Sequence, residues 1–176
     1  MEEMTSKKIF LRGGDNLFFN DAVLLFFMKL MSEWQSSKKI ALLMGCSAHK
    51  PYSKSFIHRK VISMLRRHNL SEYVQEYIIG EPMTVVPREW ENVYPADSYD
   101  FPPEKLGDEG RRIFINRLNA FFRKAITMHE MFIVFAPNHH KKIILEACSG
   151  LFEPIVVPYN IYNLPKLLNA LKEVVK

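Results

Sequence analysis

Short apolar runs alternate with amphipathic stretches along the chain after residue 38. Four runs have the length and apolar character of buried strands, and they are KIALLMG (39–45), YVQEYIIG (73–80), MFIVFA (131–136) and EPIVVP (153–158). The first half of 73–80 is also compatible with a helix. Amphipathic spacing predicts helices over 55–68, 108–128, 138–148 and 164–175, and the proline- and aromatic-rich stretch 82–103 is expected to be a long loop. This order predicts an α/β fold, a three-layer sandwich around a mainly parallel four-stranded sheet.

The residues before the first predicted strand differ from the rest of the chain, because they contain no strand-like run. We expect residues 1–38 to be an N-terminal helical extension and residues 39–176 to be the α/β core, within one compact domain overall. The helix expected over 20–35 is apolar nearly all round, which fits either a buried helix or a docking face for another subunit. Its most apolar part, AVLLFFMKLM, is far shorter than the roughly 20 residues of a membrane span and begins too late for a signal peptide.

Composition narrows the class of protein further. The chain has 176 residues, of which 48% are apolar, so it can bury a substantial core. A formal charge of +5 moderately favours a polyanionic partner. The two cysteines, Cys46 and Cys148, make neither a disulfide framework nor a metal-type spacing, so a reducing cytoplasm is the simplest compartment.

A polar loop follows each predicted strand. In parallel sheets ligands bind beyond the carboxyl ends of the strands, so these loops are expected to gather at one edge. We therefore expect four residues to face that edge, namely Cys46, Glu89, Asn138 and Tyr159. The sequence places the candidate active site there.

The loop after the first strand, CSAHKPYS, carries most of the candidate chemistry. Lys50 and the start of the following helix would both favour the thiolate form of Cys46, which is a good nucleophile. His58 lies one turn into that helix and could move a proton, while Tyr52 could stack on a ring or donate a hydrogen bond. The plainer interpretation is that Cys46 is a small buried apolar residue and that Ser55 only caps the helix.

This loop resembles the core domain of archaeosine synthase, an archaeal tRNA-modifying family related to the tRNA-guanine transglycosylases. The family signature reads Pro-Cys-x3-Lys-Pro-Tyr-x2-Ser-x2-His, and its cysteine and later positions are occupied here by Cys46, Lys50, Pro51, Tyr52, Ser55 and His58. Gly45 stands where the family has proline. A second block, VVPREWENVYPADSYD (85–100), is similar to the family's Val-Pro-Arg-Glu-Leu-Glu, Tyr-Pro-Ala and Tyr-Asp segments, with Trp90 in place of leucine.

The match covers roughly residues 40–100 and has departures. Met83 and Thr84 replace the Leu-Gly that often precedes the second block, and FPPEKLGDEG replaces the Thr-Gly-x-Trp that often follows it. No stretch resembles the transglycosylase barrel or the family's RNA-binding PUA domain. One expectation is therefore a split enzyme, in which a PUA-containing subunit is a separate partner.

The resemblance implies a uracil-DNA-glycosylase-like fold and a specific reaction. Archaeosine synthase is expected to add the ε-amine of free lysine to the nitrile of 7-cyano-7-deazaguanine in tRNA, giving an amidine without a cofactor. A radical-SAM partner then removes the lysine carbon skeleton. These implications make tRNA and free lysine the expected binding partners.

The residues of both blocks suit that chemistry. Cys46 would add to the electrophilic nitrile carbon, with His58 as proton donor and Lys50 either holding the thiolate or contacting phosphate. Arg88 and Glu89 would hold the carboxylate and α-amine of lysine, and Asp100 would do the same or act as base. Tyr52, Ser55 and Tyr99 complete the expected substrate-binding set. A salt bridge that braces the loop fits Arg88 and Glu89 equally well.

Other interpretations stay open at this point. His139 and His140 either begin a solvated helix or line the site. The protein could be a base-excision enzyme of the uracil-DNA-glycosylase superfamily, because HKPYS faintly resembles a water-activating loop, although the acidic residue that such a loop needs is missing. It could also be a non-catalytic tRNA-binding subunit.

Overall fold

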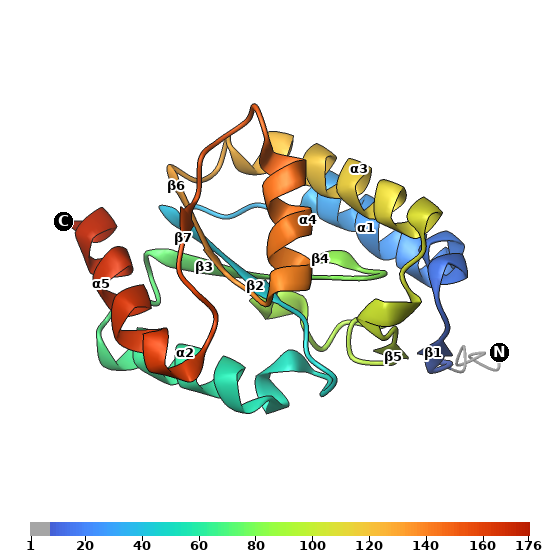
Figure 1. The fold of residues 1–176 in the computed structure, drawn as a ribbon, viewed down its shortest axis with the longest axis horizontal. Helices are drawn as coiled ribbons and strands as arrows, with labels where there is room; N and C mark the ends of the chain where they lie inside the picture. The colour runs from blue at the N-terminus through green and yellow to red at the C-terminus, as the bar shows by residue number, and fades with distance from the viewer. Residues whose placement is uncertain (1–7) are drawn as a thin grey trace, which may run out of the picture.

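The computed structural model describes residues 8–176, which fold around a five-stranded sheet in the order β4-β3-β2-β6-β7 (Figure 1). Its parallel strands are β2 (Ile40–Gly45), β3 (Val74–Gly80), β6 (Met131–Phe135) and β7 (Ile155–Val156). The edge strand β4 (Thr84–Pro87) runs antiparallel to β3. The predicted α/β class and mainly parallel sheet are confirmed, whereas the predicted count of four strands is wrong.

The missing strand lies inside the stretch that the sequence predicted to be a loop. Pro82 and Pro87 bracket β4, and proline normally signals a turn or the limit of a strand. Here Glu81, Pro82 and Met83 form the tight connection of a β3–β4 hairpin, in which Val85 pairs with Ile79. The hairpin carries the chain back along β3, which changes where the following residues lie.

Helices cover both faces of the sheet. Over residues 8–176 these are α1 (Asp21–Glu33), α2 (Phe56–Arg67), α3 (Asp108–Ala125), α4 (Asn138–Cys148) and α5 (Leu164–Val175). Figure 1 shows α1, α3 and α4 on one face and α2 with α5 on the other. Side chains of β2 alternate accordingly, since Ala41 and Leu43 join the first core and Leu42 joins the second. The predicted three layers are confirmed.

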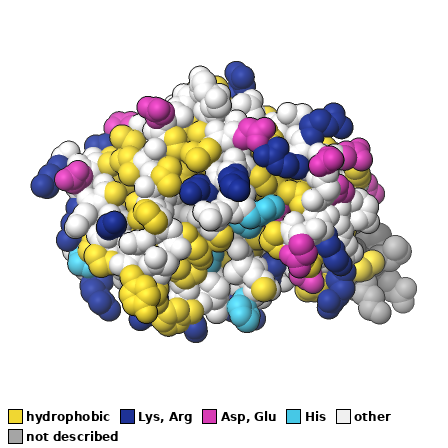
Figure 2. Space-filling view, in the orientation of Figure 1, with side chains coloured by type: hydrophobic (Ala, Val, Ile, Leu, Met, Phe, Trp, Pro, Cys, Tyr) yellow, Lys and Arg dark blue, Asp and Glu magenta, His cyan; other side chains and the backbone are white. Residues whose placement is uncertain are grey.

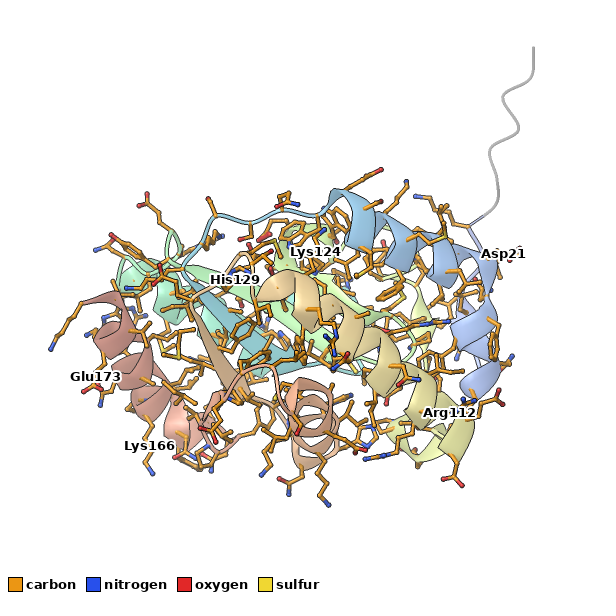
Figure 3. The ribbon with its side chains drawn as sticks, turned by 90° about the horizontal axis from the view of Figure 1, so that it is seen from above. Asp21, Arg112, Lys124, His129, Lys166 and Glu173 are labelled. Carbon is orange, nitrogen blue, oxygen red and sulfur yellow. The ribbon has the colours of Figure 1, made fainter. Side chains whose placement is uncertain are left out.

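The N-terminal segment packs into the same core as the sheet. The expected extension 1–38 begins outside the described residues, but from residue 8 onward it is tied to the rest. Val23, Phe26 and Leu30 of α1 are buried, and Lys124 of α3 donates hydrogen bonds to the Leu30 and Met31 carbonyls at the end of that helix (Figure 3). The nearly all-round apolar helix is therefore buried along one side.

Short elements complete the chain. A second small sheet pairs β1 (Leu11–Arg12) in parallel with β5 (Tyr99–Asp100). In the described part of the chain, five short 3-10 helices lie in the connections, and they are η1 (Asp15–Phe19), η2 (Tyr52–Lys54), η3 (Arg88–Trp90), η4 (Pro103–Lys105) and η5 (Ile161–Asn163). Within residues 8–176, the helices lack the combined length and hydrophobicity that a membrane crossing requires.

Candidate active site

Three segments meet at the carboxyl edge of the sheet, as the sequence predicted. Cys46 directly follows β2, and its backbone N–H donates to the Ile79 carbonyl of β3 at 2.9 Å. Glu81 directly follows β3, and His139 and His140 lie in the first turn of α4 after β6. Because β2 is central between β3 and β6, the three strand ends bring these side chains together.

The cluster is held by hydrogen bonds to one carboxylate. The Cys46 Sγ lies 3.6 Å from His140 Nε2, and that nitrogen lies 2.9 Å from Glu81 Oε1. The second carboxylate oxygen, Oε2, lies 2.8 Å from His139 Nε2. Glu81 and His140 are buried, while Cys46 is half-buried and so remains within reach of a ligand.

Burial and charge act against each other on this cluster. Burial raises the pKa of Glu81, but the hydrogen bonds from His139 and His140 outweigh it and bring the pKa down to about 2. Burial lowers the pKa of His140, but the neighbouring Cys46 and Glu81 outweigh it and raise the pKa to about 10. At neutral pH, His140 is thus an imidazolium beside the thiol, an arrangement that activates cysteine as a nucleophile.

Two glycines make room for this approach. A Cβ at Gly80 would lie 2.6 Å from Cys46 Sγ, and a Cβ at Gly45 would lie 2.7 Å from Pro137 Cδ and 2.9 Å from His140 Nδ1. Such distances are too short for real contacts, so a side chain at either position would push the cluster apart. Gly45 takes the place of the family's proline in the signature, and here its missing side chain is what admits His140.

Lys50, Tyr99 and Asp100, three of the residues predicted for the site, lie near the cluster. The Lys50 Nζ lies 4.4 Å from the centre of the Tyr99 ring. Burial lowers the pKa of Lys50, and this effect exceeds the opposing influence of Cys46, Asp100 and Glu81. The Tyr99 hydroxyl lies 2.7 Å from that of Tyr52, and burial raises the pKa of both phenols, so they stay neutral.

Tyr52 and Ser55 have inward roles in this structure. The Tyr52 ring is fully buried and stacks on His58 at 6.2 Å between ring centres, so it is not free to stack on a ligand. The Ser55 hydroxyl accepts a hydrogen bond from the His58 backbone N–H at 3.4 Å, which makes it the N-cap of α2. Both residues support the loop that carries Lys50.

His58 is placed differently from the expected proton donor. Its Nε2 lies 3.0 Å from the Gly45 carbonyl, and its Nδ1 lies 2.8 Å from Arg88 Nη2. Burial and the Arg88 guanidinium lower its pKa to about 4. A neutral ring that donates from Nε2 and accepts at Nδ1 has no proton left for a substrate. The geometry therefore makes His58 a positioning residue.

Arg88 and Glu89 do not lie at the edge occupied by Cys46, which corrects the expectation for Glu89. Pro87 pairs with Tyr77, so the hairpin has already turned the chain back from the edge. Glu89 accepts a hydrogen bond from the Gln75 side chain at 2.8 Å, near the start of β3. The sequence placed both residues at the edge because β4 was not recognised.

The Arg88 guanidinium is engaged by buried carboxylates. It forms ion pairs with Glu76 at 2.8 Å and with Glu91 at 2.9 Å. Glu91 also accepts a hydrogen bond from the Ser53 backbone N–H at 3.2 Å, which ties the loop carrying Lys50 to this group. The loop-bracing interpretation of Arg88 fits this geometry, with Glu91 rather than Glu89 as the partner.

The pocket beside Arg88 and Glu89 is separate from the cysteine cluster. It measures about 470 Å³, and its lining includes Arg66, Glu76 and Asn92 but none of Cys46, Glu81, His139 and His140. The reactive groups and this pocket therefore lie at different places. We assign the candidate chemistry to the cluster, because that is where nucleophile, carboxylate and imidazole meet.

Sequence reasoning did not include Glu81 among the candidate site residues. Its hydrogen bonds with His139 and His140 were therefore not foreseen. The signal was available, because Glu81 is the first residue after the glycine that ends a buried strand. The rule that located Cys46 at the end of β2 applies equally to Glu81 at the end of β3. Asn138 and Tyr159 lie at the expected edge, since Asn138 begins α4 and Tyr159 packs against Phe135 at the end of β6.

Comparison with known proteins gives consistent matches. The family model described as "Domain of unknown function (DUF5591)" matches residues 23–172. Archaeosine synthase subunit alpha of Thermoplasma acidophilum is 33% identical over 141 residues, which cover 78% of this chain and 25% of that protein. The subunit alpha of Methanosarcina acetivorans is 36% identical over 95 residues, covering 51% and 15%. The archaeosine synthase of Methanocaldococcus jannaschii is 28% identical over 121 residues, covering 67% and 20%.

These matches confirm the resemblance drawn from the sequence motifs. The chain spans a quarter or less of the length of these curated relatives. Among solved structures, the crystal structure of AF0587, a protein of unknown function, has a TM-score of 0.63 and 21% sequence identity over 86% of this chain and 49% of that one. It shares the fold.

Proposed function

The chain belongs to the DUF5591 family, and from this premise we propose that it acts in archaeosine formation in tRNA. The relatives that carry the name archaeosine synthase support this assignment. The reaction proposed is the addition of the lysine ε-amine to the nitrile of 7-cyano-7-deazaguanine in tRNA, with an amidine as product. The observation that carries it is the thiol of Cys46 at 3.6 Å from the buried imidazole of His140, at the edge where α/β sheets bind ligands.

The first step is attack of the Cys46 thiolate on the nitrile carbon. A carbon–sulfur bond forms, one π bond of the nitrile breaks, and the nitrile nitrogen takes a proton from His140 Nε2, which gives a thioimidate. His140 replaces His58 as the proton carrier, because its Nε2 lies 3.6 Å from the Cys46 sulfur. Glu81 keeps the imidazole oriented through its 2.9 Å hydrogen bond.

The second step releases the enzyme. The lysine amine attacks the thioimidate carbon, the carbon–sulfur bond breaks, and the sulfur leaves as thiolate. The proton that the amine loses returns to His140, which restores the starting state. The Lys50 ammonium stabilises negative charge near the sulfur, and the negative charge of Asp100 favours the charged form of Lys50. Tyr99 supports Lys50 through the face of its ring, while Tyr52, Ser55, His58 and Arg88 act as positioning residues.

The proposal includes partners. The name "subunit alpha" of two relatives supports an enzyme of several subunits, and the expected partners are a PUA-containing subunit and a radical-SAM enzyme. Figure 2 shows Lys and Arg side chains spread over the face in small groups among apolar and uncharged atoms. Such a distribution supports phosphate contacts of modest strength that weaken with salt. Tight and salt-insensitive binding of tRNA by this chain alone would contradict the split arrangement.

The test is lysine transfer to tRNA that carries 7-cyano-7-deazaguanine, measured with labelled lysine with and without the candidate partners. Cys46→Ser should abolish transfer, because a serine hydroxyl is a poor nucleophile at its free pKa. Cys148→Ser is the matched control and should transfer normally, since Cys148 is buried in α4. Without lysine, mass spectrometry should find the nitrile-bearing nucleoside attached to a Cys46 peptide. Near-normal transfer by Cys46→Ser would overturn the covalent mechanism, and tRNA binding without any transfer would favour a non-catalytic subunit.

A further inference from the structure

We propose that Cys46, Glu81 and His140 also form a three-ligand site for a thiophilic divalent cation such as Zn²⁺. Their ligand atoms, a sulfur, a carboxylate oxygen and an imidazole nitrogen, all lie within 4.8 Å of one another. They come from the ends of β2 and β3 and from the first turn of α4, so three different elements aim them at one point.

The sulfur–nitrogen distance fits tetrahedral coordination. With bonds of about 2.3 Å to sulfur and about 2.0 Å to nitrogen, a tetrahedral zinc ion separates these two ligands by roughly 3.5 Å. The observed separation of Cys46 Sγ and His140 Nε2 is 3.6 Å. The Glu81 Oε1 lies 2.9 Å from the same nitrogen and would move outward by about half an ångström to reach the tetrahedral spacing.

The contacts of the His140 ring also support a metal site. In a nucleophile–histidine–carboxylate triad, the nucleophile and the carboxylate contact opposite nitrogens of the ring. Here both the sulfur and the carboxylate contact Nε2, whereas the buried Nδ1 has no hydrogen-bond partner among residues 8–176. The sulfur and the carboxylate converge on one nitrogen and surround the position that a cation would occupy.

A residue outside the ligand set orients one of the ligands. The Oε2 of Glu81 lies 2.8 Å from His139 Nε2, so the carboxylate is oriented by a partner that is not itself in the ligand set. Outer-shell partners of this kind fix the direction of metal ligands. The absent side chains of Gly45 and Gly80 keep the three ligands close, as described above.

The ligand types select the ion. Thiolate and imidazole favour Zn²⁺ and Co²⁺, whereas Mg²⁺ and Ca²⁺ prefer oxygen ligands alone. Three protein ligands leave a fourth position for water, on the side where Cys46 is half-buried. Lys50 is close enough to act on Cys46 and Glu81 and weakens cation binding through repulsion.

A cation at this site would occupy both Cys46 and His140 Nε2. Neither could then act as nucleophile or proton carrier, so metal-loaded protein would be inactive in lysine transfer. This consequence rests on the proposed function, but the binding itself does not. Metal binding and lysine transfer by metal-free protein are separate measurements. A protein that binds no metal could still transfer lysine, and a protein that transfers no lysine could still bind the metal.

The test is titration of the reduced, chelator-treated full chain with Co²⁺, followed by absorption spectroscopy. We expect one equivalent to bind with a thiolate-to-cobalt charge-transfer band and the intense visible bands of tetrahedral cobalt, both abolished by added Zn²⁺ and unaffected by Mg²⁺. Cys46→Ser should remove the charge-transfer band and weaken binding by more than the 10- to 100-fold typical of outer-shell changes. Cys148→Ser, the matched control, should keep the band and the affinity.

A second variant keeps the test independent of stability. His140→Gln should weaken Co²⁺ binding as strongly as Cys46→Ser, while His139→Gln should keep the charge-transfer band, because His139 orients Glu81 without being a ligand. Circular dichroism of each variant shows whether it is folded at the titration temperature. Folded wild-type protein without a charge-transfer band, or a band that survives in Cys46→Ser, would overturn the proposal.

Discussion

His58 and His140 approach Gly45 from opposite faces of the sheet, and one is neutral at neutral pH while the other is charged. Both rings are buried, so burial lowers the pKa of each. The difference lies in their neighbours. His58 faces the Arg88 guanidinium and has a pKa of about 4, whereas His140 faces a thiol and a carboxylate and has a pKa of about 10.

The neighbours of each ring indicate which histidine can transfer a proton to a substrate. Beside His58, the Arg88 guanidinium is held by ion pairs with Glu76 at 2.8 Å and with Glu91 at 2.9 Å. The His140 region ends on the half-buried sulfur of Cys46. A buried network of ion pairs stabilises a loop, while a charged ring next to a half-buried nucleophile can exchange protons with a substrate.

The largest effect that separates the two histidines should be seen in catalysis. His140→Gln keeps a hydrogen bond to Glu81 but removes the proton carrier, so lysine transfer should fall by about 10²- to 10⁴-fold. His58→Gln in folded protein should lower transfer by less than about tenfold, because that ring only positions the loop. The measurement is single-turnover transfer of labelled lysine to nitrile-bearing tRNA. Equal losses in the two variants would contradict the assignment of His140 as proton carrier and of His58 as positioning residue.

The next effect concerns the stability of the Arg88 region. Arg88→Met leaves the carboxylates of Glu76 and Glu91 buried without their cation, which should lower the free energy of unfolding by about 3–5 kcal/mol. Arg67→Met, on the exposed end of α2, should change it by less than about 0.5 kcal/mol. Urea unfolding followed by circular dichroism measures both. A small loss for Arg88→Met would mean that these carboxylates are solvated in solution.

The pH dependence of stability is a further difference, because the two histidines act on it in opposite directions. The unfolded chain binds a proton at His58 near pH 6.5 and the folded one only near pH 4, so stability should fall by about 3 kcal/mol as the pH drops between these values. His140 has a raised pKa, so its contribution is complete below pH 6.5 and is lost as the pH rises toward 10.

The combined contribution of His58 and His140 to the stability of metal-free protein should therefore be greatest near pH 6.5. Urea unfolding across the pH range, in buffer with a chelator, tests this. His58→Gln should flatten the acid side alone, and His140→Gln the alkaline side alone. An acid side that keeps its slope in His58→Gln would show that another group is responsible.

Local sequence patterns were enough to predict the architecture and the edge at which Cys46 lies. The apolar runs of β2, β3 and β6 and the polar loops after them are properties of neighbouring residues. The pairing of β4 with β3 is different, because a four-residue strand that follows Pro82 closely and ends in Pro87 carries too little periodicity to be recognised. Once that hairpin was missed, Arg88 and Glu89 were placed at the wrong end of β3.

The candidate site shows the same limit. His58 lies twelve positions after Cys46 in the matched motif, so proximity in sequence favoured it as the proton donor. His140 is 94 residues away and reaches the sulfur only because β6 pairs beside β2. Which of two histidines meets a thiol depends on strand order and on the clearance left by Gly45 and Gly80. Neither can be read from local composition.

The central position of β2 also determines when the site comes into being as the chain folds. Cys46 and Glu81 are both present in the first half of the chain, where β2 and β3 can pair through a single helical crossover. The imidazole arrives only with β6 and α4, and contacts between residues so far apart in the chain form late because a long loop must close first. We therefore expect the thiol to lack its activating partner until β6 and α4 have packed beside β2.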